Sequence, residues 1–371
     1  MSSPAANHDS SHRHLLARAA PGAPAKVDAI IVPTSRPSSC LRTVIALAKH
    51  HRCTLVALCS RRSSAEAAAS LAEREGVEIV AVDIAAATPG LIPEFRTTAM
   101  LRGGVFDRRT DTSVKRNLGL LMAAVAGWER VVYVDDDVVV PRPDDLGDAA
   151  GLLGEYSRVG LPVGGFPDNS VVCHAHRDAG GAQDTFIGTG TLAVGEASFT
   201  SFFPDTYNED WLFLLNDTGL SPSAVTGLAI QQPYDPYLDT TRARTEEFGD
   251  CIAEGLFSLL GAGRRLTDAD AGYWHRYLAR RRLFINEVMG MAERAQLDSV
   301  TKDRMRACLT AALECNLLIG PGLCLDFMSA WRADRQTWRR HVELTRRHHG
   351  GQPVQKLLAD AGLVHRYLSG A

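Results

Sequence analysis

The sequence predicts an α/β fold with a mostly parallel β-sheet flanked by helices, followed by a helical C-terminal region. Short apolar runs alternate with helical patterns between residues 27 and 140. Such alternation is typical of parallel strands joined by right-handed helical crossovers. One apolar run, at 131–134, leads directly into Asp135, Asp136 and Asp137. From about residue 245 onward, helical patterns dominate.

Three regions are expected in the 371 residues: a flexible tail over 1–26, a main domain over 27–240 and a helical region over 241–371. This length suits one large domain with a smaller attached unit. The formal net charge of −3 gives no signature of nucleic-acid binding. No apolar run approaches the roughly 18 residues that a membrane span needs, so we expect no membrane span.

The first 26 residues are rich in Ser, Ala, His and Pro and lack the apolar segment of a secretory signal. His8, His12 and His14 could bind a metal ion, but this polar composition favours a disordered tail. The eight cysteines form no Cys-x-x-Cys pair, which favours a reduced cytoplasmic protein with mostly buried thiols.

The main domain is predicted to begin with strands over 27–33, 54–59 and 77–84, separated by helices over 38–50 and 65–75. Residues 85–109 form a less regular segment with room for a short helix. No Gly-x-Gly-x-x-Gly motif follows the first strand, so a dinucleotide-binding fold of the usual kind is not supported.

A helix over 112–126 carries Lys115, Arg116 and Asn117 in its first two turns. Its apolar positions lie on one face, as expected for a helix that packs on a sheet. Cations at a helix N-terminus oppose the helix dipole, and such conflicts with local rules often mark functional sites. An anionic diphosphate bound there would resolve the conflict.

The three consecutive acids follow a predicted buried strand, and ligands of open α/β sheets bind at the carboxyl ends of strands. Adjacent carboxylates repel one another unless a positive group neutralises them. Hard oxygen ligands suit Mg²⁺ or Mn²⁺, with water and phosphate completing the coordination. Side chains alternate along a strand, so Asp135 and Asp137 are expected on one face and Asp136 on the other. The alternative is a solvated acidic turn.

These features resemble the GT-A-type nucleotide-sugar glycosyltransferases, above all the inverting class with an Arg-Asn-x-Gly helix before an Asp-x-Asp strand. The likeness covers about residues 27–235. Its motifs are Pro33-Thr34, Arg116-Asn117-x-Gly119 and Asp135-Asp136-Asp137. The resemblance implies a GT-A-type catalytic domain with a nucleotide-binding half over 27–140 and an acceptor half over 141–240.

The resemblance also implies roles for individual residues. The nucleotide sugar would be bound by Pro33, Thr34, Arg36, Ser60, Lys115, Arg116, Asn117, Asp135 and Asp136. Asp135 and Asp137 would lie at the metal. Some GT-A-type enzymes take a third metal ligand from a C-terminal histidine, and His275 is the candidate for that ligand here. The alternatives are an ordinary strand end for Pro33-Thr34 and a solvated helix residue for Arg116.

One departure concerns the nucleotide base. Many relatives end the second strand with an acid that reads the base, but Cys59, Ser60 and Arg61 occupy this position here. The identity of the nucleotide therefore stays open.

The acceptor half is expected to contain a short strand over 171–176 and an apolar stretch over 186–194. Gly188 and Gly190 in that stretch suggest that the backbone approaches a ligand closely. The resemblance implies that this ligand is the donor sugar or the acceptor. His174 and His176 would share one face of the strand and could bind a metal, although such a pair is more often structural.

Asn208 is a predicted helix N-cap, with Glu209 and Asp210 in the first turn and Trp211 beside them. In the inverting relatives the Asp of this Glu-Asp pair deprotonates the acceptor hydroxyl as general base. Trp211 could stack on an acceptor ring or belong to the core. Acids in a first helical turn are favourable in any case, which is the structural alternative.

The C-terminal region is predicted to form helices over 245–261, 301–318, 325–349 and 354–368, with an Arg-rich helix after Tyr273-Trp274-His275. Its Arg and His residues between 332 and 349 suit a solvated face, an anionic acceptor or a homodimer interface.

The sequence thus favours a cytoplasmic, metal-dependent transferase that moves a sugar from a nucleoside diphosphate sugar to a hydroxyl of a small soluble metabolite. A sugar-phosphate nucleotidyltransferase is one alternative, but it would carry a Gly-rich basic loop where Thr34-Ser35-Arg36-Pro37 stands. The other is a non-catalytic nucleotide-sugar-binding protein, against which the acids at 135, 137 and 210 argue.

Overall fold

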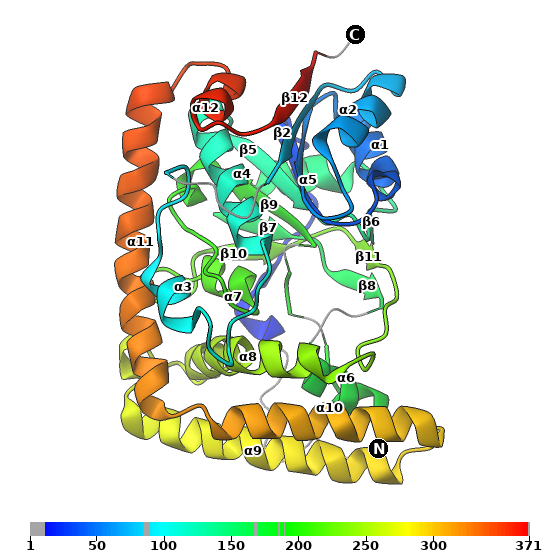
Figure 1. The fold of residues 1–371 in the computed structure, drawn as a ribbon, viewed down its shortest axis with the longest axis vertical. Helices are drawn as coiled ribbons and strands as arrows, with labels where there is room; N and C mark the ends of the chain where they lie inside the picture. The colour runs from blue at the N-terminus through cyan, green and yellow to red at the C-terminus, as the bar shows by residue number, and fades with distance from the viewer. Residues whose placement is uncertain (1–11, 85–89, 167–169, 185, 189, 370–371) are drawn as a thin grey trace.

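The computed structural model describes residues 12–84, 90–166, 170–184, 186–188 and 190–369 (Figure 1). Within them, the main sheet has nine strands in the order β1-β10-β7-β9-β5-β2-β3-β4-β12. These strands are β1 (Ala17–Arg18), β2 (Ala29–Thr34), β3 (Thr54–Cys59), β4 (Ile79–Asp83), β5 (Arg130–Val134), β7 (Arg158–Gly160), β9 (Thr191–Gly195), β10 (Ser223–Val225) and β12 (His365–Leu368). A smaller sheet joins β6 (Val138–Val139), β11 (Ala229–Gln231) and β8 (Val163–Gly165).

The centre of the main sheet is parallel, because β5, β2, β3 and β4 run in the same direction. Their side chains alternate between two hydrophobic cores: Ala29 and Ile31 enter one, Ile30 and Val32 the other. Burial on both faces explains why these strands are continuous apolar runs. The predicted fold class is confirmed: an α/β protein with a mostly parallel sheet, flanking helices and a helical C-terminal region.

Helices cover both faces of the sheet. One core packs the sheet against α1 (Arg42–His51), α2 (Ala65–Arg74) and α5 (Asp145–Gly151). The other packs it against α4 (Thr112–Ala126), α7 (Glu209–Leu214), α8 (Thr240–Gly261) and α11 (Pro321–His349). The short helix α3 (Arg96–Leu101) contacts α11. The carboxyl ends of the parallel strands all meet the same edge of the sheet.

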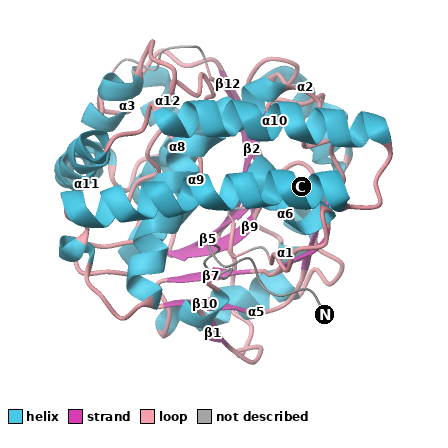
Figure 2. Cartoon of the chain, turned by 90° about the horizontal axis from the view of Figure 1, so that it is seen from below, coloured by secondary structure: helices cyan, strands magenta, loops and turns pink. Residues whose placement is uncertain are grey.

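The C-terminal helices form one end of the molecule, where α9 (Ala271–Arg294) and α10 (Ser299–Leu317) lie side by side against α6 (Val171–Asp178) and α8 (Figures 1 and 2). From there α11 runs along one side of the molecule towards the sheet. After α12 (Val354–Asp360) the chain returns as β12, antiparallel to β4.

Three predicted elements are wrong. Residues 171–176 begin α6 rather than a strand, because Ser170 caps a helix by accepting a hydrogen bond from the Cys173 N–H. The helix predicted over 354–368 ends at Asp360, and Gly362 with φ of 68° precedes the strand β12. Tyr273, Trp274 and His275 lie inside α9 instead of preceding it.

The expectation of a flexible tail is wrong for residues 12–26, whereas residues 1–11 lie outside the described residues. Ala17 and Arg18 form β1, which extends the sheet by pairing with β10. Leu16 is buried in the core, and the Ala19 N–H donates to the Val225 carbonyl. Backbone pairing with an open sheet edge orders a segment whose polar composition suggested disorder.

No single described helix is long and apolar enough to span a bilayer. Helices α10 and α11 have the length and apolar composition of a membrane span only when they are taken together, and the chain bends by 80° between them.

Candidate functional site

The position of α4 is set by Gly119, the last residue of the Arg-Asn-x-Gly motif. A Cβ atom at this position would lie 2.8 Å from Cγ2 of Ile31 and 3.0 Å from the Tyr133 hydroxyl. The glycine therefore allows α4 to pack closely on β2 and β5. Tyr133 also donates a hydrogen bond of 2.6 Å to the Arg116 carbonyl, which fixes the first turns of α4 beside the acidic end of β5.

Two residues expected at the nucleotide are committed to contacts within the protein. The Asn117 side chain bonds both the carbonyl and the N–H of Phe203, each at 2.8 Å, and so anchors the segment before α7. The Lys115 ammonium donates to the Thr34 carbonyl and the Ser60 hydroxyl and pairs with Asp111 at 3.0 Å. Burial lowers the pKa of Lys115, although Asp111 opposes this effect.

Arg116 forms the centre of a buried ion-pair network. Its guanidinium pairs with Glu209 and, at 3.2 Å, with Asp135. Glu209 also accepts a hydrogen bond of 2.7 Å from Arg108. Burial alone would raise the pKa of Glu209, but Arg108 and Arg116 outweigh it and lower the pKa. Glu209 is thus an ionised anchor for two arginines.

The three acids lie in a turn directly after β5, closed by a hydrogen bond from the Val138 N–H to the Asp135 carbonyl. Asp136 accepts a hydrogen bond of 2.5 Å from the Thr34 hydroxyl. The guanidinium of Arg36 pairs with Asp137 at 2.5 Å and with Asp136 at 3.5 Å. Burial raises the pKa of Asp136, and its bonds to Thr34 and Arg36 oppose that effect.

The expected alternation of these acids is wrong. Asp136 and Asp137 share Arg36, whereas Asp135 pairs separately with Arg116. Strand alternation does not apply, because the backbone leaves the strand at Val134 and turns. Two arginines therefore supply the positive charge that three neighbouring carboxylates require.

A cavity of about 240 Å³ lies beside this network. Seven residues expected at the site line it together: Arg116, Asp135, Gly188, Gly190, Glu209, Asp210 and Trp211. A Cβ atom at position 188 would lie 3.4 Å from Oδ2 of Asp210, so any side chain there would enter the space next to this carboxylate. Gly190 accepts a backbone hydrogen bond from Asp135. The tertiary structure thus brings the acidic turn and the Glu209-Asp210 pair to one cavity.

Asn208 occupies the N-cap position of α7, as expected, but it does not cap the helix through its side chain. Its backbone is left-handed, with φ of 56°. Its amide instead donates to Asp250 at 2.9 Å, which ties the start of α7 to α8. Glu209 and Asp210 do occupy the first turn, and Oδ1 of Asp210 accepts from the Trp211 N–H.

Sequence reasoning missed two contributors to the cavity. Arg108 lies in the irregular segment after α3, and no motif marks it. His12 belongs to the segment whose composition favours a disordered tail, yet it is only 3% exposed and its ring lies 5.7 Å from the Trp211 ring. Arg13 pairs with Asp184, another cavity residue, at 3.3 Å. The N-terminal segment therefore forms part of the cavity wall.

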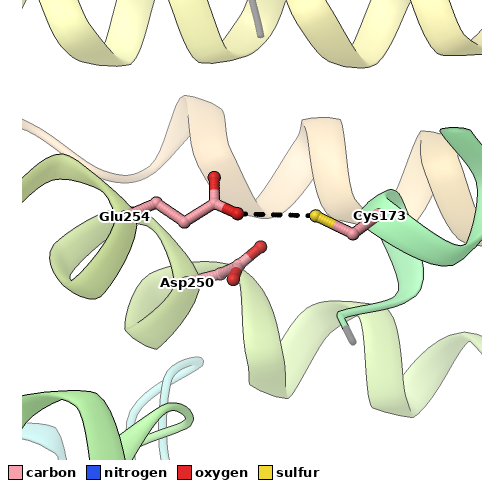
Figure 3. A group of neighbouring side chains, drawn as sticks. All are labelled: Cys173, Asp250 and Glu254. Carbon is pink, nitrogen blue, oxygen red and sulfur yellow. Dashed lines mark hydrogen bonds between the residues drawn. The ribbon is translucent and has the colours of Figure 1, made fainter. Parts of the chain in front are cut away.

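Within the described residues, one group brings three metal-capable side chains within 4.8 Å of one another: Cys173, Asp250 and Glu254 (Figure 3). Arg281 pairs with this group, at 2.6 Å from Asp250 and 3.0 Å from Glu254. Burial raises the pKa of Glu254 to about 8, and the neighbouring Asp250 adds to the rise. Together with Arg281, this group joins α6, α8 and α9, and its three residues also line the cavity.

The histidines singled out in the sequence have other surroundings. His174 accepts a hydrogen bond at Nδ1 from Arg177 and lies 2.8 Å from the Tyr234 hydroxyl through Nε2. Burial lowers the pKa of His174 to about 3, so its ring is neutral. The His176 ring packs on Phe284. His275 is exposed on α9 and is not among the described residues that line the cavity beside the acidic turn.

Other residues named in the sequence analysis make contacts within the protein. Thr34 is buried at the end of β2, and Pro33 precedes it in register with Leu58 of β3. All eight cysteines are free, and all but Cys40 are buried. Ser60 holds Lys115, as described above.

No family model matches this chain, and no curated protein matches it. Among solved structures, it is similar to the mannosyltransferase PcManGT from Pyrobaculum calidifontis in complex with GDP-Man and Mn2+. The sequence identity is 13%, the match covers 92% of this chain and 82% of that chain, and the TM-score is 0.37. At these values the likeness assigns neither a ligand nor a mechanism to this chain.

Proposed function

We propose that this protein is a metal-dependent glycosyltransferase of the GT-A type, which transfers a sugar from a nucleoside diphosphate sugar to an acceptor hydroxyl. One observation carries the proposal: a single cavity is lined by Asp135 from the acidic turn, Arg116 from α4 and Asp210 from α7. These residues come from three separate segments of the chain. A small soluble acceptor and an inverting reaction are part of the proposal.

The residues of the acidic turn fit a divalent metal ion by their chemistry. Carboxylate oxygens are the ligands that Mg²⁺ and Mn²⁺ prefer. Asp135 and Asp137 are the ligands we assign, and Asp137 would exchange its contact with Arg36 for the ion. When bound, the metal neutralises the diphosphate that leaves with the nucleotide.

The protein side chains supply the remaining chemistry. Arg116 is held rigidly by Glu209 and Asp135, so its positive charge is already in place beside the leaving group. Asp210 lines the same cavity and would accept the proton of the attacking hydroxyl at a carboxylate oxygen. Glu209, bound to two arginines, positions Arg116 rather than accepting the proton.

A thermal-shift panel of nucleoside diphosphates with and without Mn²⁺ tests the proposal, because a ligand that binds the folded state raises the melting temperature. We expect a shift with one nucleotide that depends on the metal and is lost in Asp137→Ala. Absence of any shift across the panel would reject the assignment. Transfer activity that persists in EDTA would reject its metal.

A further inference from the structure

A second cavity, of about 820 Å³, lies at the carboxyl ends of β3 and β4. Ser60 and Ile84, which directly follow these two strands, line it. The first turns of α4 separate it from the first cavity, since Thr112 and Arg116 line the first cavity while Ser113 and Asn117 line the second.

The second cavity combines apolar walls with charged residues at its edge. Its apolar side chains are Ile84, Ile92, Pro93, Phe95, Val114 and Phe203. Exposed Arg61, Arg102 and Arg109 supply positive charge. Mostly apolar walls with a few polar groups are typical of small-molecule sites. A flat ring that is attached to an anionic group matches this lining.

Two residues of the lining each carry a buried polar atom without a hydrogen-bond partner among the described residues: Oγ1 of Thr110 and Oδ1 of Asp205. An unpaired buried polar group is costly, and a carboxylate oxygen more so than a hydroxyl. Burial accordingly raises the pKa of Asp205 to about 6. A ligand that donates N–H groups to this carboxylate would remove the cost.

A short chain of contacts links the second cavity to the acidic turn. Ser60 and Asp111 line the cavity and hold the Lys115 ammonium. Lys115 bonds the carbonyl of Thr34, and the hydroxyl of Thr34 bonds Asp136. A nucleotide with its diphosphate at the turn therefore has this cavity as the neighbouring space for its base.

We propose that the second cavity receives the nucleobase of the donor and that Asp205 determines which base is bound. The inference rests on the proposed function. Asp205 would supply the acid that is missing at Cys59, Ser60 and Arg61 after β3. It comes instead from the segment that Asn117 anchors through Phe203, just before α7.

The chemistry of a carboxylate selects among the bases, because an ionised carboxylate only accepts hydrogen bonds. Guanine presents a ring N–H and an amino group side by side, which match the two oxygens of Asp205. Uracil presents one N–H between two carbonyls that repel the carboxylate, and adenine and cytosine each place a ring acceptor beside the amino group. The pattern of donors and acceptors on the bases thus favours a guanosine diphosphate sugar.

Calorimetric titration of the full-length protein with GDP and with UDP, each with Mn²⁺, tests the inference. We expect the wild type to bind GDP at least tenfold more tightly than UDP. Asp205→Asn should bind GDP at least tenfold more weakly than the wild type, with no loss for UDP. Glu314→Gln is the control, because Glu314 is an exposed carboxylate that pairs with Arg244 and lines neither cavity. It should change neither affinity.

The outcomes separate this inference from the proposed function. Equal binding of GDP and UDP by the wild type, unchanged GDP binding by Asp205→Asn, or an equal loss of both nucleotides would overturn the role of Asp205. The transferase proposal would survive each of these results. If the wild type binds neither these nor any other nucleoside diphosphate, the proposed function fails and the inference fails with it.

Discussion

Asp210 is the residue on which the mechanism depends, since it lines the cavity and its neighbour Glu209 is committed to two arginines. Asp210→Asn keeps the size of the side chain but removes its ability to take a proton. We expect normal nucleotide binding and melting temperature, with turnover reduced by about 10² to 10⁴, the usual contribution of a positioned acid or base. Steady-state rates and the melting temperature measure this.

The stereochemistry of the product must agree with that role. A base at Asp210 implies direct displacement, so an α-linked donor should give a β-linked product by NMR. Retention of the anomeric configuration would defeat the assignment even if the variant were inactive. Near-normal turnover in Asp210→Asn would leave this carboxylate a structural role, to which its bond from the Trp211 N–H belongs.

Arg36 neutralises Asp136 and Asp137 in the structure, so we expect it to compete with a metal ion for these carboxylates. Arg36→Ala should bind Mn²⁺ more tightly than the wild type in the absence of nucleotide, by about tenfold, which corresponds to ~1.4 kcal/mol. Calorimetric titration with MnCl₂ alone measures the affinity. Arg61→Ala is the control, because Arg61 follows the adjacent strand β3 and donates to the Arg109 carbonyl instead of pairing with Asp136 or Asp137. It removes the same charge and should leave the Mn²⁺ affinity unchanged. Identical Mn²⁺ affinities in the wild type and Arg36→Ala would contradict the competition.

At the scale of elements, the first turns of α4 line both cavities, and the distance of α4 from the sheet depends on Gly119. Gly119→Ala should destabilise the protein by roughly 1–3 kcal/mol, the usual cost of overpacking, despite the better helix propensity of alanine. Urea denaturation measures the change in the free energy of unfolding.

Gly290→Ala provides the control within another helix, α9. The added Cβ there would meet only the flexible end of Arg294, at 3.3 Å. This substitution should therefore be neutral or stabilising by up to about 1 kcal/mol. Equal effects of the two substitutions would show that close packing of α4 is not what requires Gly119.

At the scale of the whole molecule, buried acids in the helical end make stability depend on pH. The pKa of Glu254 is raised to about 8 from an ordinary value of 4.5. The folded state therefore binds more protons than the unfolded state between these pH values, and its stability falls as the pH rises from about 4.5 to about 8. Glu254→Gln should make this fall shallower in urea denaturation at a series of pH values.

Glu314→Gln is the control for this pH dependence, because Glu314 is exposed and pairs only with Arg244 among the described residues. It should leave the pH dependence as in the wild type. An unchanged slope in Glu254→Gln would show that this carboxyl group does not carry the excess proton.

The sequence by itself determined the elements whose local signals agree. The apolar runs that became β2, β3, β4 and β5 are buried on both faces, so their composition alone predicts them. The start of α4 at Thr112 and the position of Glu209 and Asp210 in a first helical turn were also predictable. The prediction for α6 was wrong because its valines fit a strand as well as a helix. The cap at Ser170 favours the helix.

Only the tertiary structure decided how the site is assembled. Arg116 and Glu209 are 93 positions apart, and their ion pair forms because Gly119 and Asn117 hold two distant segments together. The pairing of Arg36 with Asp136 and Asp137 depends on a turn that strand alternation does not describe. His12 and Asp205 have no local signal at all. Their places in the two cavity linings arise from packing against residues far along the chain, which is a property of the folded molecule rather than of any segment.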